Sequence, residues 1–391
     1  MPQCLRKVPG SQHMVSMLLA RIPGWIAFFA YFLTLAPTVT LEWSGMLVTA
    51  ADHGGVPIPP GYPLWTILAG LFARAFSWVT FNGHPNPAWG VGLMSAVFGA
   101  LTVANVAALV RQVHTREDSD RLPAAVAGAS ASLILAFSHT FWTKCVVAEP
   151  VTLYLFLLTL FLRLGLKWIQ EGRAAEAYAL AVVCGLGVLT SYAFGVVLLI
   201  LPFLVIAAGR DAIRRLHPAV LLMCFVAGLL PVLYLPIASA QNPPMNWGYA
   251  RSWEGFLHVI RRGQFERIDV TANAADFMAH PEKVSRLISV VLHHLLAQFR
   301  LPLILVALAG SIVAGIKPDI RRTWHLLLGL LFVAYIVAIL LVQNPLLDIQ
   351  TLFIARIAWL PLSVLTALFI GTALFSYTRQ LLSPRPTTPA P

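Results

Sequence analysis

Residues 41–65 read LEWSGMLVTAADHGGVPIPPGYPLW and connect two apolar runs, at 22–41 and 63–80. The segment from Ser44 to Ala51 predicts a short helix lying in the membrane interface. The prolines that follow, from Pro57 to Pro63, predict a stiff turn, because proline fixes φ and cannot donate a backbone hydrogen bond. This stretch decides the topology, since the run at 63–80 either crosses a membrane or lies on its surface.

The composition is that of a polytopic helical membrane protein. Of the 391 residues, 58% are hydrophobic and only 11% are charged, whereas soluble domains carry about 25% charged residues. This excludes an ordinary soluble protein, and it excludes a disordered chain, which needs low hydrophobicity and high charge. The four cysteines are scattered and show no C-x-x-C spacing, so neither a metal site nor a disulfide framework is indicated.

A membrane-spanning helix needs about 20 apolar residues. Runs of this kind predict an all-α polytopic membrane protein of about ten transmembrane helices, at 22–41, 88–110, 122–139, 146–165, 177–190, 193–208, 219–238, 299–316, 325–342 and 357–376. The pair at 177–190 and 193–208 has an alternative interpretation as one long tilted helix. Interfacial helices are expected in the outside loops, which cover 42–87 and 239–298.

The charge distribution favours a surface position for 63–80. If 63–80 does not span the membrane and the N-terminus is cytoplasmic, 16 of the 27 Lys and Arg residues fall in short cytoplasmic loops and tails. This distribution is what the positive-inside rule requires. We therefore expect a cytoplasmic segment at 1–21, a membrane domain at 22–376 and a disordered, Pro/Thr-rich cytoplasmic tail at 377–391. The expected location is the bacterial inner membrane.

Under this topology, the residues capable of chemistry gather at the outer face. Glu42, at the predicted outer end of the first helix, and Asp52 are candidates for a general base. Glu42 has the alternative role of a solvated helix end. In the turn SHTFWTKCVVAEP at 138–150, Lys144 and Glu149 stand out. A carboxylate inside a membrane is costly and usually paired, although a helix dipole could also stabilise it.

The outside loop starting at 241 reads QNPPMNWGYARSWEGFLHVIRRGQFERID, in which aromatic and arginine residues alternate. Arginine forks suit phosphate, and aromatic side chains suit the membrane interface. The alternative is an amphipathic helix lying on anionic lipid; a nucleic-acid partner is not expected on this face. The last outside loop, QNPLLDIQTLFIAR at 343–356, places Asp348 and Arg356 two helical turns apart, where they could form an ion pair.

Four blocks in this order resemble the protein O-mannosyltransferase-like membrane family, also known as domain of unknown function 2723. They are LAPTVTLEWSG with GVPIPPGYPLW, SHTFWTKCVVAEPVTLYLF, QNPPMNWGYARSWEGFLHVIRRGQFERI and NPLLDIQTLFIAR. The resemblance covers roughly residues 30–360. It implies a C-type glycosyltransferase fold, a polyprenyl-phosphate sugar as donor, a carboxylate base in the first outside loop and cationic groups on the donor phosphate. No divalent metal or other cofactor is indicated.

The chain departs from the family pattern at three places. The family commonly has Asp-Ser-Gly-Glu at 43–46, where this chain has Trp-Ser-Gly-Met; it has His in place of Ile58, and a His-rich pair at 191–192, where this chain has Ser-Tyr. The resemblance therefore also admits a catalytically silent relative. A lipid or polysaccharide transporter is the alternative from another functional class.

The sequence thus predicts a membrane glycosyltransferase that moves a mannose-like hexose from a polyprenyl-phosphate donor to an acceptor hydroxyl of a protein or glycan on the periplasmic or luminal face. Its predicted catalytic residues are Glu42 and, second, Asp52. The residues expected to bind the donor phosphate are Arg251, Arg261, Arg262, Arg356 and Lys144. Those expected to line the substrate groove are His53, Tyr62, Trp142, Glu149, Trp247, Tyr249 and Asp348.

Overall fold

The structure is a computed structural model that describes residues 9–41, 43–261, 263, 281–316, 320–343, 345 and 347–382. The first half comprises α1 (Pro9–Leu33), α2 (Ser44–His53), α3 (Pro63–Ala75), the hairpin β1 (Thr80–Phe81) and β2 (His84–Pro85), α4 (Pro87–His114), η1 (Asp118–Asp120), α5 (Arg121–Ala136), α6 (His139–Cys145), α7 (Val151–Glu171) and α8 (Ala174–Val188).

The second half comprises α9 (Phe194–Leu198), α10 (Leu201–Arg214), α11 (Pro218–Leu229), η2 (Leu230–Leu233), α12 (Tyr234–Ala240), α13 (Trp253–Ile260), α15 (Pro281–Ile316), α16 (Ile320–Ala338), the π-helical turn η4 (Ile339–Gln343), α17 (Ile349–Ala355), η5 (Arg356–Trp359) and α18 (Leu360–Leu382). Helices occupy most of every predicted span, so the all-α polytopic class is confirmed.

Within the described residues, seven helices are long and apolar enough to cross a membrane, or eight if α5 and α6, bent by 74°, count as one span. The apolar parts of α1 and α8 are shorter. The helix α3 has 13 residues and is therefore about 20 Å long, less than the hydrocarbon thickness of about 30 Å. Its length favours the interpretation of 63–80 as non-spanning.

One prediction about the spans was wrong, and one alternative is excluded. The run at 22–41 is helical only to Leu33, because Pro37 follows and cannot continue a helix, and the chain then lies along another segment. The runs at 177–190 and 193–208 are separate helices joined by a turn at 189–193, so the single tilted helix is excluded. The predicted interfacial helix from Ser44 to Ala51 is present as α2.

The helices α4, α5 and α18 form the centre of the bundle, and α1, α7 and α15 pack around them. Small residues allow this close packing, as is usual between membrane helices. At Gly128 on α5, for example, a Cβ atom would lie 2.5 Å from the carbonyl oxygen of Ala107 on α4. No larger residue fits there without moving the two helices apart.

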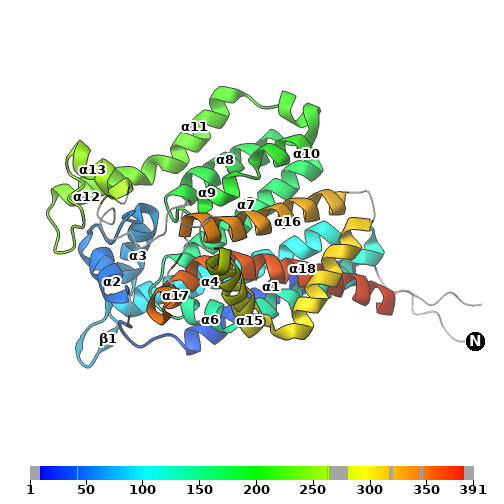
Figure 1. Cartoon of the computed structure of the whole chain (residues 1–391), viewed down its shortest axis with the longest axis horizontal. Coiled ribbons are helices and arrows are strands. Elements are labelled where there is room, and N and C mark those ends of the chain that lie inside the picture. Colours follow the sequence, from blue (N-terminus) through cyan, green and yellow to red (C-terminus); the bar gives the residue numbers. More distant parts are fainter. Residues whose placement is uncertain are drawn as a thin grey trace, which may run out of the picture.

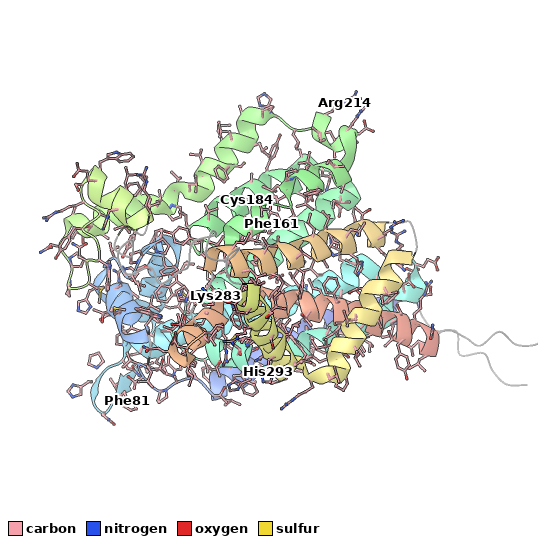
Figure 2. All side chains as sticks on the ribbon, viewed as in Figure 1. Phe81, Phe161, Cys184, Arg214, Lys283 and His293 are labelled. Carbon is pink, nitrogen blue, oxygen red and sulfur yellow. The ribbon has the colours of Figure 1, made fainter. Side chains whose placement is uncertain are left out.

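The short elements gather at one end of the bundle. Figure 1 shows α2, α3, β1, α12 and α13 together at the left, whereas α10 and α18 finish toward the right. Figure 2 places Phe81 of the hairpin at the left end and Arg214 of α10 at the opposite side of the molecule. We call the end that carries α2 and α13 the outer end, since it holds the loops predicted to lie outside.

Candidate functional site at the outer end of the bundle

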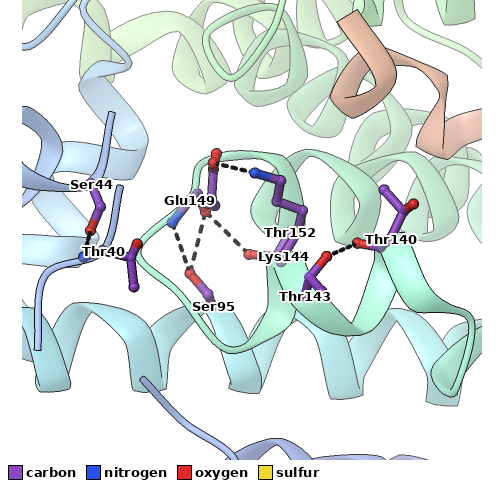
Figure 3. Close-up of polar contacts among 8 residues, drawn as sticks. All are labelled: Thr40, Ser44, Ser95, Thr140, Thr143, Lys144, Glu149 and Thr152. Atoms are coloured by element: carbon purple, nitrogen blue, oxygen red, sulfur yellow. Dashed lines mark hydrogen bonds and ion pairs between the residues drawn. The ribbon is translucent and has the colours of Figure 1, made fainter. Parts of the chain in front are cut away.

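A buried ion pair forms the centre of the candidate site. The Lys144 Nζ atom, in the last turn of α6, lies 3.0 Å from Oε1 of Glu149, two residues before α7, and the two side chains are only 11% and 7% exposed. Ser95 on α4 accepts a hydrogen bond from the Glu149 amide at 3.2 Å and lies 3.3 Å from the Glu149 carbonyl. Figure 3 shows Lys144 folding back to reach the carboxylate. The predicted cost of an intramembrane carboxylate is thus offset by a buried cation.

The segment between α1 and α2 runs along this pair. The amide of Ala36 donates to the carbonyl of Val146 at 2.9 Å, and Asn86 Nδ2 donates to the carbonyl of Pro37 at 2.7 Å. Farther along, the Thr40 amide donates to Ser44 Oγ at 3.3 Å, and Figure 3 draws both residues on the side of Glu149 that faces α2. The first outside loop therefore lies directly against the turn that holds the ion pair.

This path corrects the predicted position of Glu42. The first helix ends at Leu33, nine residues before Glu42, and the described residues 34–41 are non-helical. Glu42 itself lies outside the described residues. Of its neighbours, Leu41 is exposed and Trp43 packs against the core.

Asp52, the second candidate base, lies on α2 with an exposed side chain. Its Oδ2 is 3.6 Å from Nδ1 of His53, and both side chains are largely accessible. Tyr62, at the start of α3, is half-buried against the core, and Trp142 donates through Nε1 to Thr34 Oγ1 at 3.0 Å. Of these four residues, Trp142 is the one with a packing role in the wall of the site.

The outer loop of residues 241–252 covers the first outside loop. The amide of Val56 donates to the Met245 carbonyl at 2.8 Å, and the amide of Trp247 donates to the Val56 carbonyl at 3.0 Å, so the two loops pair in parallel. Gly55 is required here, because a Cβ atom would lie 2.2 Å from the carbonyl oxygen of Met245. Tyr234 Oη adds a hydrogen bond to the Gly55 carbonyl at 2.9 Å.

This loop encloses a shallow depression of about 530 Å³, lined by residues 242–249, which include Trp247 and Tyr249. Beside it, the guanidinium group of Arg251 lies 5.9 Å from the centroid of the Tyr249 ring. The helix α13 follows, with Trp253 stacked on Phe256 at 5.8 Å. The structure therefore brings together exposed aromatic and arginine side chains, as the alternating pattern predicted.

The structure says less about two other residues predicted to bind phosphate, Arg261 and Arg262. Arg261 is exposed at the end of α13, and the adjoining turn is tied down by a hydrogen bond from the Tyr192 hydroxyl to the Ile260 carbonyl. Arg262 lies outside the described residues. The roles of Arg251, Arg261 and Arg262 on phosphate therefore remain predictions.

Asp348 caps a helix. Its Oδ1 accepts a hydrogen bond from the Thr351 amide at 2.9 Å at the start of α17, and this bond holds the pKa of Asp348 below its ordinary value. In the described part of the chain, no ion pair joins Asp348 to Arg356, which is exposed in η5. The predicted pairing of these two residues is therefore not formed, because the carboxylate serves the helix terminus instead.

Three residues of the site were missed in the sequence. Ser95, Asn86 and Gln298 each hold a loop in place through a hydrogen bond to a distant residue; Gln298 on α15, for example, accepts from the Thr140 amide at 2.9 Å. A polar residue on an otherwise apolar helix was the available signal for Ser95 and Gln298. Their partners are 54 and 158 residues away, and no local pattern identifies them.

Within the described residues, no group of three or more His, Cys, Asp and Glu side chains is placed to hold a metal ion. The buried His294 instead packs edge-on against Trp359 at 5.4 Å.

Comparison with known proteins agrees with the fold, and the family model covers most of the first two sequence blocks. Residues 44–213 match the model of the protein O-mannosyl-transferase TMEM260 N-terminal domain. The chain is 28% identical to protein O-mannosyl-transferase TMEM260 of Mus musculus over 253 residues, covering 61% of this chain and 34% of that protein. It is 23% identical to the protein of the same name in Dictyostelium discoideum over 288 residues, covering 69% of this chain and 33% of that protein.

The chain thus spans about a third of the length of these curated relatives. Among solved structures, the crystal structure of ArnT from Cupriavidus metallidurans bound to undecaprenyl phosphate superposes with a TM-score of 0.59 at 15% identity, covering 90% of this chain and 59% of that one. At this identity the likeness concerns the fold, which is that of the C-type glycosyltransferases. The resemblance indicated by the sequence is confirmed: this chain is similar to the protein O-mannosyl-transferase TMEM260 family, whose N-terminal domain corresponds to residues 44–213.

Proposed function

We propose that the chain is a membrane glycosyltransferase that moves a mannose-like hexose from a polyprenyl-phosphate donor to an acceptor hydroxyl at the outer end of the bundle. The observation that carries the proposal is the buried ion pair of Lys144 and Glu149, held against the loop that contains Glu42. The names of the curated relatives support the activity. The undecaprenyl phosphate bound by ArnT, a protein of the same fold, supports the donor class.

In the proposed reaction, the acceptor oxygen attacks the anomeric carbon of the sugar, and the bond from that carbon to the phosphate oxygen breaks. The configuration at the anomeric carbon inverts, the acceptor proton passes to a carboxylate, and polyprenyl phosphate leaves with the electron pair. Negative charge on the phosphate increases as that bond breaks, and a fixed cation stabilises it without reorganisation. Lys144 is suited to this task because Glu149 holds its ammonium group, which carries three donors, in place.

The proposal is tested by incubating membranes that contain the full chain with radiolabelled polyprenyl-phosphate mannose and an acceptor protein. Transfer of label to the acceptor, absent in membranes lacking the chain, is the expected result. Movement of the intact labelled lipid across the membrane without transfer would support the transporter alternative instead. No reaction with mannosyl, glucosyl or arabinosyl donors would favour a catalytically silent relative.

The arginines of the 241–263 loop are proposed to bind the donor phosphate. Charge-assisted hydrogen bonds contribute about 1.5–3 kcal/mol each, so Arg251→Ala, Arg261→Ala and Arg262→Ala are each expected to weaken binding of polyprenyl phosphate by about tenfold. Binding is measured with a fluorescent polyprenyl phosphate in detergent micelles. Arg286→Ala, an exposed arginine on α15, is the control and should leave affinity unchanged. Unchanged affinity in all three variants would contradict phosphate binding and indicate that these arginines contact the lipid surface instead.

The proposed topology has the N-terminus in the cytoplasm, with the outer end on the periplasmic or luminal face. Ser77, beyond α3, and Ser119, in η1, are exposed at opposite ends of the bundle. Single cysteines introduced at these serines, in a chain otherwise free of cysteine, are expected to react from opposite sides of the membrane. Labelling by an impermeant maleimide in intact cells should modify Ser77→Cys alone. Modification of both positions in intact cells would contradict the arrangement.

A further inference from the structure

The seam between α4 and α7 carries polar side chains toward the end of the bundle that lies opposite the candidate site. The two helices run parallel, and Asn105 Nδ2 donates to Thr159 Oγ1 at 3.1 Å across the seam. Nearer the helix ends, Gln112 Nε2 donates to Gln170 Oε1 at 3.0 Å. Polar contacts of this kind join packed transmembrane helices, and they give the charged residues of the seam polar neighbours.

Two arginines lie in this part of the seam, Arg111 in the last turns of α4 and Arg163 in the second half of α7. Both are half-buried, and each has a buried Nε atom without a hydrogen-bond partner among the described residues. Arg163 donates through Nη1 to Asn105 Oδ1 at 2.7 Å. Arg163 thus reaches α4 six residues before Arg111, which is about 9 Å along the helix.

Most carboxylates described at this end are paired with other cations, and Glu117 accepts a hydrogen bond from Ser119 Oγ at 3.2 Å. Asp120 contacts Arg379 at 2.9 Å and Arg321 at 3.5 Å, and Asp118 contacts Arg121 at 2.8 Å. The remaining pairs join Glu176 to Lys167 and Arg173, Glu171 to Arg173, and Asp211 to Arg214. A buried charge needs a counter-charge or a full set of hydrogen bonds. For Arg111 and Arg163, the described part of the chain supplies neither.

We propose that Arg111 and Arg163 together bind the phosphate group of an anionic phospholipid in the leaflet opposite the candidate site. Arg163 lies eight residues before the end of α7, and Lys167, whose side chain is 42% exposed, lies one turn farther on. A guanidinium group at that depth, about 6 Å along the helix from Lys167, reaches a lipid headgroup. Basic pockets between transmembrane helices bind anionic headgroups in this way, and arginine forks match phosphate oxygens.

The test uses the purified full chain in nanodiscs of phosphatidylcholine with or without phosphatidylglycerol, and native mass spectrometry to count retained lipids. The wild type is expected to retain phosphatidylglycerol in preference to phosphatidylcholine and to unfold at a higher temperature in its presence. Arg111→Gln and Arg163→Gln are each expected to weaken this retention at least tenfold. Each substitution removes a charge-assisted hydrogen bond, and a loss of ~1.4 kcal/mol, which is less than one such bond contributes, already corresponds to a factor of ten. Arg210→Gln, an exposed arginine at the same end, is the matched control.

A separate arm adds inorganic phosphate to protein in phosphatidylcholine alone. If inorganic phosphate stabilises the wild type and neither glutamine variant, the two arginines bind phosphate, but the natural ligand is a soluble phosphate ester and not a lipid. If either variant fails to fold, Arg163→Lys keeps the charge and removes the planar fork, and weaker retention is expected from it. A wild type that shows no preference for phosphatidylglycerol and no response to phosphate overturns the proposal. So does equal retention by the wild type and all variants.

Discussion

Replacing Lys144 by methionine is expected to lower the free energy of unfolding by about 3–5 kcal/mol and to abolish sugar transfer. The substitution leaves the Glu149 carboxylate, 7% exposed, without its cation, and removing one partner of a buried ion pair strands an uncompensated charge. Thermal unfolding of the purified chain and transfer from polyprenyl-phosphate mannose measure the two effects.

The double variant Lys144→Met with Glu149→Gln separates structure from chemistry. Removing both charges is expected to recover most of the stability, since a buried pair and its neutral replacement are often nearly equal in free energy. Transfer should remain lost if Lys144 stabilises the leaving phosphate. Lys167→Met is the control, because Lys167 pairs with Glu176 at 3.1 Å with its own side chain 42% exposed and such pairs contribute about 0–1 kcal/mol. Recovery of transfer in the double variant would reduce the pair to a structural role.

Replacing Glu42 by glutamine is expected to slow transfer by about 10²–10⁴-fold, which is the contribution of a positioned general base. Glutamine keeps the size of the side chain but cannot accept the proton of the acceptor hydroxyl. Ala36, six residues before Glu42, donates a hydrogen bond of 2.9 Å to Val146, which lies in the turn that holds the ion pair. The measurement is initial rate of label transfer, with donor affinity determined in parallel.

Asp52→Asn is the matched control, because Asp52 lies on the exposed side of α2 and its near neighbour is His53 at 3.6 Å. We expect its transfer rate to stay within a few-fold of the wild type and the donor affinity of both variants to be unchanged. A rate lost in Asp52→Asn and kept in Glu42→Gln would exchange their roles. Wild-type rates in both would place the base elsewhere.

The sequence predicted the helices better than the contacts between them. Apolar runs located helices at all ten predicted positions, because hydrocarbon thickness imposes a length that a single sequence displays. Within the described residues, seven of these helices, or eight with the bent pair, are long and apolar enough to cross a membrane. The end of the first helix was misplaced by eight residues, since residues 34–41 are apolar enough to continue it and the effect of Pro37 was underestimated. Hydropathy indicates only whether a segment prefers lipid or water. The course of residues 34–41 is instead set in part by the hydrogen bond from Ala36 to Val146, a residue more than a hundred positions away, which hydropathy does not reveal.

The candidate site was predicted only in part, because many of its contacts join residues that are far apart in the sequence. Lys144 was singled out for the donor phosphate and Glu149 as a carboxylate that needs a partner, whereas the pairing of the two with each other was not predicted. The pairing of Val56 with Met245 and Trp247 joins loops about 190 residues apart, and Gly55 is its only local sign. Asp348 was predicted to face Arg356, yet a helix N-terminus close by in sequence competed successfully for its carboxylate.

The helix α18 is last in the sequence and central in the bundle, where it packs on α4, α5, α7, α15 and α16. A ribosome that delivers helices in order must therefore place α4 and α5 in the bilayer long before their shared neighbour exists. Until α18 arrives, the surfaces that receive Leu362 and Leu365, both fully buried in the finished protein, face lipid or one another. The bundle therefore receives its central helix only when α18 has been inserted between helices that are already in the membrane, so a chain cut short before residue 360 lacks its core and not merely its edge.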